Sequence, residues 1–481
     1  MGNGLDQDLL LPVSLREWLP TDHLAYIVID IVNQLDITGM CEKYRRDGRG
    51  GWAYHPLMML ATLCYCYMTG VVSSRGIEQR CREDVPTRIV SRNTCPDHAT
   101  FARFRRDNPE LIAALYAKVL RLCVHEGLVS ATVLAVDGTK IPGNASLESS
   151  FTVETLARMV IEHAEAHDQE DERRERQHHL DGIDASCSEV MRPGSDREAR
   201  IRKALAELDA EQAAAAQATG RDAPHGTKHS SVRKKGNVTD PDSRGMTSRH
   251  GMIQGYNVQI MVDSHEQVIV AQAVTQDRND TNQLVPLMTQ MTDNLQGAGI
   301  DQIGVVLADH GYLTEPNARV PNTLIGVDAP TTTPEKRRAV QRRRIHDTAA
   351  KVAQGILTRD EGAHLLGVKP DTMRKYVYTW YKQQDYNARH TRDGPDHEND
   401  EDDDPDPIGT MAFLLEEPAN KQLYRRRCGI VEPVFGQIKH NHHFTRFSQR
   451  GLPYVTTEWT LVCVSHNIRK LAKHTTRTLP A

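Results

Sequence analysis

The sequence predicts an α/β protein, in which a mixed sheet carries helical insertions and an all-α N-terminal domain precedes it. Three observations predict this fold class. Apolar side chains recur at helical spacing through residues 12–130. Short apolar runs of strand length follow between residues 131 and 327. Two stretches, 150–235 and 328–420, have a different composition and interrupt the strand pattern.

The N-terminal region is predicted to consist of helices. Apolar residues recur at helical spacing from Leu24 to Leu35, and Asp22 is the predicted N-cap of this helix. A second helix is predicted over Pro56–Met68, because proline suits the first turn of a helix. A further helix follows Asp97 and carries a basic face made of Arg103, Arg105 and Arg106. This face either contacts a DNA backbone or is solvated.

Buried strands are predicted where short apolar runs end in an acid or a turn. Val133–Asp137 (VLAVD) is the first of these runs. Gly255–Val262 and Val268–Val274 are predicted to pair as a hairpin. Ile303–Ala308 is another buried strand, and Asp309 follows it directly.

A helix over residues 280–296 separates the hairpin from the last of these strands, and helices close the chain. With the insertions removed, the order is three strands, a helix, a strand and a C-terminal helix. This is the order of the RNase H-like fold. The predicted organisation is a helical, DNA-binding N-terminal domain at 12–130, an RNase H-like core at 131–327 and 421–475 with a helical insertion at 150–235, and a second insertion at 328–420.

Charge is distributed unevenly along the chain. The formal net charge is −5, but residues 396–406 (DHENDEDDDPD) hold eight acids and no base. Without those eight acids the formal net charge becomes +3. A chain segregated in this way presents basic patches to nucleic acid although it is acidic overall. The acidic run itself is predicted to be a solvated loop of the second insertion.

Composition excludes several other classes of protein. The nine cysteines include no Cys-x-x-Cys pair, which argues against a zinc ribbon or a disulfide framework. No apolar run approaches the ~20 residues that span a bilayer, and the first residues lack the features of a signal peptide. No phosphate-binding Gly-x4-Gly-Lys-Ser/Thr motif occurs. We therefore expect a cytoplasmic, nucleoid-associated protein without a membrane partner.

Three acids stand where a metal-dependent site requires them. Asp137 and Asp309 each end a predicted strand, so both project from one sheet edge if these strands are neighbours. Glu432 lies at or near the start of a C-terminal helix, and Lys439 follows seven residues later on the same helix face. Mg²⁺ prefers oxygen ligands, and paired ions support in-line displacement at phosphorus. We predict that the three acids bind Mg²⁺, with Mn²⁺ as a substitute, and that Lys439 binds a DNA phosphate.

Other residues compete for these roles or leave a choice open. Asp263 also ends a strand. If it were the first ligand, only one further strand would separate it from the helix before Asp309, and the three-strand meander would be lost. Asp263 is therefore predicted to be a turn residue. Glu416 and Glu417 are rivals for the third acid, but neither is followed by a lysine at the same spacing. Lys140 either contacts phosphate or is a solvated lysine. Pro433 fits the first turn of a helix, where no hydrogen-bond donor is lost.

Four segments resemble the core of bacterial insertion-sequence DDE transposases: VLAVDGTKIPGNAS (133–146), NVTDPDSRGMTSRHGMIQGYNVQIMVD (237–263), LADHGY (307–312) and YRRRCGIVEPVFGQIKHNHHFTRF (424–447). The stretch from LREWLPTDHLAYIVIDIV to PDHATFARFR resembles the N-terminal domain of the same family. The resemblance implies that Asp137, Asp309 and Glu432 are the catalytic acids. Tyr424, Arg427 and Lys439 resemble the family's Tyr-x2-Arg-x3-Glu-x6-Lys signature, although four residues separate Arg427 from Glu432.

Two further patterns leave alternatives open. Thr358–Lys382 has helix-turn-helix character, with Gly367 in the turn and Arg374, Lys375 and Tyr378 facing DNA. The alternative is an ordinary helical hairpin, and the family resemblance does not extend to this segment. His440, His442 and His443 lie within one turn without a partner cysteine, which favours phosphate contact or a surface position over a metal site.

The predicted function is transposition of an insertion sequence. Activated water hydrolyses a phosphodiester at the element end, and the released 3′-hydroxyl attacks target DNA by the same chemistry. The predicted partners are the terminal inverted repeats and target DNA, bound by a homodimer or larger assembly. The alternatives are a metal-dependent nuclease on the same fold and a DNA-binding regulator in which the acids are structural.

Overall fold

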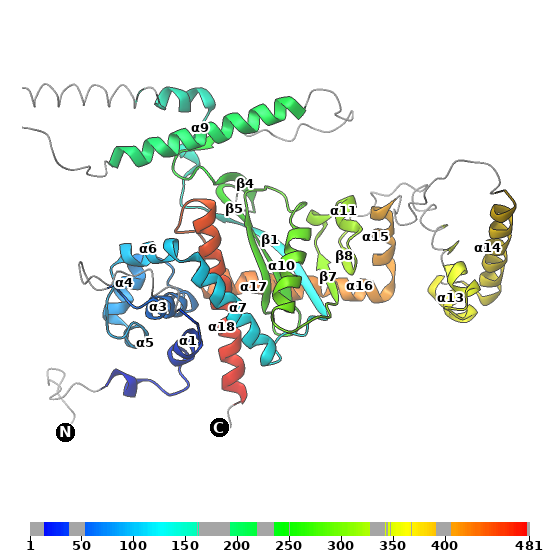
Figure 1. The fold of residues 1–481 in the computed structure, drawn as a ribbon, viewed down its shortest axis with the longest axis horizontal. Helices are drawn as coiled ribbons and strands as arrows, with labels where there is room; N and C mark the ends of the chain where they lie inside the picture. The colour runs from blue at the N-terminus through cyan, green and yellow to red at the C-terminus, as the bar shows by residue number, and fades with distance from the viewer. Residues whose placement is uncertain are drawn as a thin grey trace, which may run out of the picture. The chain divides into compact units, whose positions relative to one another are not determined.

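The computed structural model describes residues 14–37, 53–160, 162, 193–218, 235–249, 251–327, 342, 345–346, 348–366, 368–390 and 406–478. The chain divides into two compact units, whose elements are labelled in Figure 1. Unit 1 comprises Met1–Asp280, Pro286–Ile303 and Gly429–Ala481, and unit 2 comprises Thr281–Val285 and Gly304–Cys428. The acidic run at 396–405 and much of both insertions lie outside the described residues.

Helices dominate the N-terminal part of unit 1, as predicted. They are η1 (Leu15–Trp18), α1 (Leu24–Val32), α3 (Pro56–Met68), α4 (Ser74–Glu83), α5 (Val85–Val90), α6 (His98–Asp107) and α7 (Pro109–His125). Asp97 caps α6 by accepting a hydrogen bond from the backbone N–H of Thr100 at 2.6 Å. The predicted cap of α1 is wrong, because the His23 side chain, not Asp22, accepts the bond from Ala25 N.

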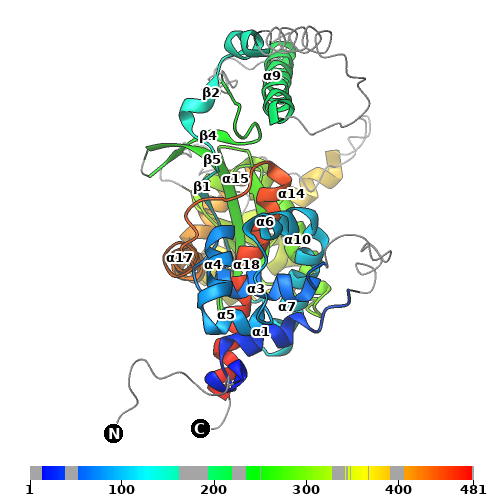
Figure 2. The ribbon, with the colours of Figure 1, turned by 90° about the vertical axis from the view of Figure 1, so that its left-hand side faces the viewer.

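The long C-terminal helix α18 (Leu452–Thr478) joins the N-terminal helices to the strands of unit 1. It contacts α7, α3 and the strand β6 (Ile269–Thr275), and both ribbon views place it beside α7 and α3 (Figure 2). The α3 helix is buried along almost its whole length. Tyr116 on α7 donates a hydrogen bond to the carbonyl of Ile269 at 3.0 Å. The N-terminal helices and these strands therefore share one core.

The strands of unit 1 form an antiparallel meander, which confirms the predicted hairpin. β5 (Gly251–Asp263) pairs with β6 on one side and with β1 (Val133–Pro142) on the other. Asp137 lies opposite Ile260 in the middle of β1. The prediction that the strand ends at Asp137 is wrong, because pairing with β5 continues as far as Pro142 opposite Gly255. Helix α10 (Leu284–Gln296) follows, and its Asn294 side chain donates to Val270 O.

The strand β4 (Arg244–Ser248) was not predicted. It pairs with the start of β5. Gly251 makes the tight connection with a φ of +105°, a conformation that favours glycine. Only Met246 of this strand is buried, so β4 lacks the apolar alternation from which strands are recognised.

The described part of the first insertion contains two helical segments. It contains η2 (Leu147–Ser149), α9 (Pro193–Ala218) and the short strand pair β2 (Ser150–Phe151) with β3 (Gly236–Asn237). Leu156, on a helical segment before the undescribed residues, packs with three residues of α9, namely Ile201, Ala204 and Leu208. This insertion therefore has a small core of its own.

Unit 2 contains a parallel strand pair followed by short helices. β7 (Val305–Ala308) pairs with β8 (Thr323–Ile325), with Val306 opposite Thr323. The strand β8 was not predicted. The other elements are η3 (His310–Tyr312), α11 (Glu315–Ala318), α13 (Arg359–Leu366), α14 (Pro370–His390), α15 (Pro407–Glu416) and α16 (Pro418–Arg425). Helix α17 (Arg427–Gly436) and the π-helix η4 (Gln437–Asn441) lead into α18.

The predicted fold class is confirmed. The structure is 58% helical, with a helical N-terminal region and a mixed sheet. The predicted domain boundaries stay predictions.

Candidate functional site

The surroundings of Asp137 in unit 1 include a cationic side chain. Asp137 is half-buried, and its Oδ1 accepts a hydrogen bond from Gly138 N at 2.8 Å. Thr139 follows Asp137 by two residues and therefore lies on the same face of β1. Its side chain accepts a hydrogen bond from Lys439 Nζ at 2.7 Å. Burial and Arg249 lower the pKa of Lys439, and the charge of Asp137 acts in the opposite direction. The structure therefore brings the predicted phosphate-binding lysine to the first predicted acid.

Helix α17 carries Glu432 on its exposed side, between the buried residues Val431 and Val434. The prediction that Pro433 stands in a first turn is wrong, because α17 begins at Arg427 and contains this proline. Proline has no N–H to donate to the carbonyl four residues earlier. That carbonyl belongs to Gly429, and it accepts a hydrogen bond from Gln267 Nε2 at 3.2 Å instead. The helix therefore continues through Glu432 toward Lys439.

Lys439 itself stands in the π-helix η4, which continues from α17. The wider π turn is visible in the backbone bond from His442 N to Gln437 O at 3.1 Å. Because a π turn inserts one residue, it changes the direction in which the following side chains point. Simple helical spacing placed Glu432 and Lys439 on one face, but it did not predict this turn.

A polar network that was not predicted lies on the opposite face of β1. Asp280 accepts hydrogen bonds from Asn257 at 2.6 Å and Gln259 at 2.7 Å, and it pairs with Lys140 at 3.6 Å. The predicted DNA contact Lys140 is thus held by a carboxylate, on the face that does not carry Asp137. A side chain at Gly138 would meet Gln259 Nε2 at 2.3 Å, so glycine is required there. The sequence signal that could have indicated this network is the pair of polar residues Asn257 and Gln259, which lie on one face of an otherwise apolar strand.

Asp309 in unit 2 lies near Arg427 and Tyr424, two residues of the C-terminal signature. It follows β7, its side chain is half exposed, and its Oδ1 lies 3.4 Å from Arg427 Nη2. Arg427 itself is buried. Burial raises the pKa of Tyr424, Arg427 opposes this and Asp309 adds to it. A Cβ at Gly326 would come within 2.3 Å of the Tyr424 hydroxyl, so this tyrosine requires glycine beside it.

The predicted DNA-contacting face of α6 needs one correction. Arg103 and Arg106 are exposed, but Arg105 is only 2% exposed. Its guanidinium lies 3.5 Å from Glu458 and donates to Tyr67, to Val72 O at 3.2 Å and to Ser74 Oγ at 2.6 Å. The prediction that Arg105 contacts DNA is wrong, because this side chain is buried and its Nη1 and Nη2 groups are engaged inside the core of unit 1.

The C-terminal histidines do not share one environment. His442 is buried and its ring centre lies 6.3 Å from that of His466, whereas His440 and His443 are exposed. His466 is also buried, and its Nε2 lies 2.9 Å from the carbonyl of Gln267. The prediction of a surface position is therefore wrong for His442.

Acidification will destabilise unit 1 through these two buried rings. Burial lowers the pKa of His442 to about 4 and that of His466 to about 3, from the ordinary 6.5. Below about pH 6.5 the unfolded chain binds more protons, so stability is present above that pH and is lost as the pH falls. We expect a loss of about 2 kcal/mol per histidine between pH 6.5 and 5 in urea unfolding.

Two variants check the source of this pH dependence. His466→Gln removes one titrating ring and will flatten the profile, whereas the exposed His440→Gln will leave it unchanged. Equal slopes for His466→Gln and the unmodified protein would place the acid sensitivity elsewhere.

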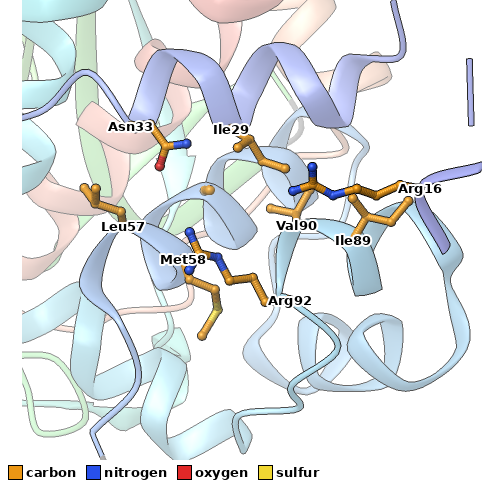
Figure 3. A pocket seen from close by; sticks show the side chains of 9 residues that line it. Arg16, Ile29, Asn33, Leu57, Met58, Ile89, Val90 and Arg92 are labelled. Carbon is orange, nitrogen blue, oxygen red and sulfur yellow. The ribbon is translucent and has the colours of Figure 1, made fainter. Parts of the chain in front are cut away.

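Unit 1 also contains a small hollow among the N-terminal helices. Figure 3 shows Arg16 and Arg92 at this hollow, together with apolar side chains of α1, α3 and α5. Arg92 has a positive φ of 52°. Sequence reasoning did not single out either arginine.

Neither a metal cluster nor a membrane span is found in the part of the chain that the structure describes. No group of three or more His, Cys, Asp or Glu side chains there is arranged to hold a metal ion. No helix there is both long and apolar enough to cross a bilayer.

Comparison with known families identifies both ends of the chain. Residues 13–107 match the family model described as a transposase domain of the DUF772 type, and residues 410–472 match the model described as a transposase DDE domain. Together the two matches support an insertion-sequence DDE transposase. No curated protein matches it, and neither does any solved structure.

The two matches cover part of the candidate site of this transposase. Tyr424, Arg427, Glu432 and Lys439 lie within the DDE match, whereas Asp137 and Asp309 lie outside both. The matches support a transposase function that acts on DNA, within a class of nucleases and transferases. Enzymes of this class generally depend on divalent metal ions.

Proposed function

We propose that this transposase cleaves DNA at the ends of its element and joins the released 3′ ends to target DNA. Asp137, Asp309 and Glu432 are the proposed metal-binding carboxylates. Their oxygen atoms are ligands of the kind that Mg²⁺ prefers, and both Asp137 and Asp309 are accessible enough to bind an ion. Bound Mg²⁺, or Mn²⁺ in its place, would activate the attacking oxygen and stabilise the leaving oxygen.

The position of Lys439 is the observation that carries this proposal. Lys439 follows Glu432 in the C-terminal motif and lies against Thr139, two residues from Asp137. A region matched by the DDE model is thereby linked, within unit 1, to the strand that holds the first acid. The lysine is half-buried and bears a charge that a DNA phosphate neutralises.

Arg427 supports the assignment of Asp309 in unit 2. The buried guanidinium of Arg427 lies 3.4 Å from the half-exposed carboxylate of Asp309 and restrains its position. The Tyr424 hydroxyl is hydrogen-bonded to Arg427 of the same pair. We propose that Tyr424 and Arg427 position Asp309 and then meet a DNA phosphate.

Cleavage and strand transfer on DNA that spans both element ends test this function. With Mg²⁺, the protein is expected to give nicked or cut ends and joined products. Cut ends without joined products would identify a nuclease on the same fold. Shifted DNA without cutting, with or without Mg²⁺, would identify a DNA-binding regulator. Joining of two ends also predicts a dimer or larger assembly on DNA, which sedimentation of the complex measures.

Replacing Lys439 with methionine will weaken binding to the element end by about threefold to tenfold. Removing one phosphate contact also reduces the slope of log affinity against log salt by about 0.9. Fluorescence anisotropy across a salt series measures both quantities. The exposed Lys473→Met on α18 is the matched control and leaves the slope unchanged. An unaltered slope for Lys439→Met would remove this lysine from the DNA interface.

A further inference from the structure

We propose that α13 and α14 form a helix-turn-helix module that binds duplex DNA, with the N-terminal half of α14 as the recognition helix. This inference goes beyond the proposed catalytic function, because it assigns a second DNA-binding surface in unit 2. It concerns residues outside both family matches.

The first helix of the module begins with a reciprocal capping arrangement. Thr358 N donates to Glu361 Oε2 at 2.8 Å, and Glu361 N donates to Thr358 Oγ1 at 3.3 Å. The sequence Thr-x-x-Glu before a helix is the capping box, which satisfies two backbone donors at once. The start of α13 is therefore fixed by local sequence.

Three residues lie between the end of α13 at Leu366 and the start of α14 at Pro370, and the first of them, Gly367, lies outside the described residues. Val368 N donates to Ala363 O at 2.9 Å, which is the six-to-one bond of a Schellman motif. Pro370 then suits the first position of α14. Helix-turn-helix proteins use a turn of this length between their last two helices.

The module has a core of its own. Ala363 and Met373 pack together with Ala349 from a preceding helical segment, and partly buried residues surround them: Val352, Leu366, Val368, Tyr376, Val377 and Trp380. A Cβ at Gly362 would meet Val352 Cγ2 at 2.6 Å, so the helices pack too closely there for a larger residue. This packing fixes which side of α14 faces outward.

The outward side of α14 is basic and aromatic. Arg374, Lys375 and Tyr378 are exposed at helical spacing, and Lys382 continues the row one turn later. The Tyr378 side chain is 62% exposed, and the Lys382 ammonium lies 5.1 Å from its ring centre. Met373 and Val377, on the other side, belong to the core. Arg374, Lys375 and Tyr378 do not contribute to the core of the module.

Duplex DNA is the partner that fits this surface. A recognition helix presents the residues of its first turns to base edges in the major groove, and arginine and lysine suit the guanine edge and the phosphates. Arg374 and Lys375 lie in the first two turns of α14. The same stripe offers no apolar groove for a peptide helix.

Binding of the full-length protein to element-end duplexes without divalent metal tests the module, because catalysis is then absent. The triple variant Arg374→Ala, Lys375→Ala and Tyr378→Ala is expected to lose at least about tenfold in affinity. The salt slope is expected to fall by about two, because two cations are removed. Lys375→Ala is compared with Lys351→Ala, which removes the same charge from the preceding helical segment.

The outcomes separate this inference from the catalytic proposal. A loss with Lys375→Ala but not with Lys351→Ala supports the module even if the triple variant unfolds. Unchanged affinity and salt slope for all variants would overturn it and leave α13 and α14 as an ordinary helical hairpin. Neither result depends on whether Asp137, Asp309 and Glu432 are catalytic.

Discussion

Replacing Asp137, Asp309 or Glu432 with the matching amide will abolish cleavage and joining of element ends. Each rate is expected to fall by a factor on the order of 10³ or more, because an amide supplies neither the charge nor both oxygen donors of a carboxylate. DNA binding is retained, since it depends on cationic side chains. Gel analysis of cut and joined products, together with anisotropy for binding, measures the two effects separately.

The exposed Glu416 provides a matched control for this prediction. It was the rival for the third acid, and it lies on α15 away from the lysine-bearing motif. Glu416→Gln is expected to keep both activities. A variant set in which Glu416→Gln is inactive and Glu432→Gln is active would show that the third acid was chosen wrongly.

Removing one partner of the buried Arg105–Glu458 pair will destabilise unit 1 by about 3–5 kcal/mol. The side chains of Arg105 and Glu458 are 2% and 0% exposed, and Glu458 also accepts hydrogen bonds from Tyr67, Ser448 and Gln449. A single substitution therefore leaves a buried charge without its partner. Urea unfolding of Arg105→Met and of Glu458→Gln measures the loss.

The double variant Arg105→Met with Glu458→Gln separates the charge from the packing. Because no charge stays buried in it, this variant is expected to be more stable than either single variant. Arg106→Met, which removes an exposed arginine of the same helix, will cost little. Additive losses in the double variant would show that the two side chains do not stabilise the fold as a pair.

Local sequence rules predicted the parts of the fold in which neighbouring residues decide the structure. The helix that follows Asp97, the helix beginning at Pro56 and the β5–β6 hairpin follow from residue types within a few positions. Asp263, which was predicted to be a turn residue, is the last residue of β5, and its carboxylate accepts a bond from His265 N in the following turn at 2.9 Å. The spacing of Glu432 and Lys439 predicted a shared helix face, but the contact of Lys439 with Thr139 on β1 joins remote segments and was not predicted.

The errors arise where a distant partner decides the structure. The basic sequence around Arg105 predicts exposure, and only Glu458 and Tyr67 explain its burial. Pro433 looks like a first-turn residue until Gln267 is seen to take the hydrogen bond of Gly429. Lys140 was left open between a phosphate contact and a solvated position, and its pairing with Asp280 could not be predicted from the sequence. No local pattern indicates these partners, because each is brought by the fold from a remote segment.

Iron-directed cleavage of the protein chain tests most directly whether Asp137, Asp309 and Glu432 bind metal at one site. Fe²⁺ replaces Mg²⁺ at oxygen-ligand sites, and with ascorbate and peroxide it cuts the backbone close to where it is bound. We expect fragments that end near all three residues, and loss of all three cuts in the single variant Asp137→Asn. Cuts near only one acid, or cuts near Asp309 and Glu432 that persist in Asp137→Asn, would contradict a shared site.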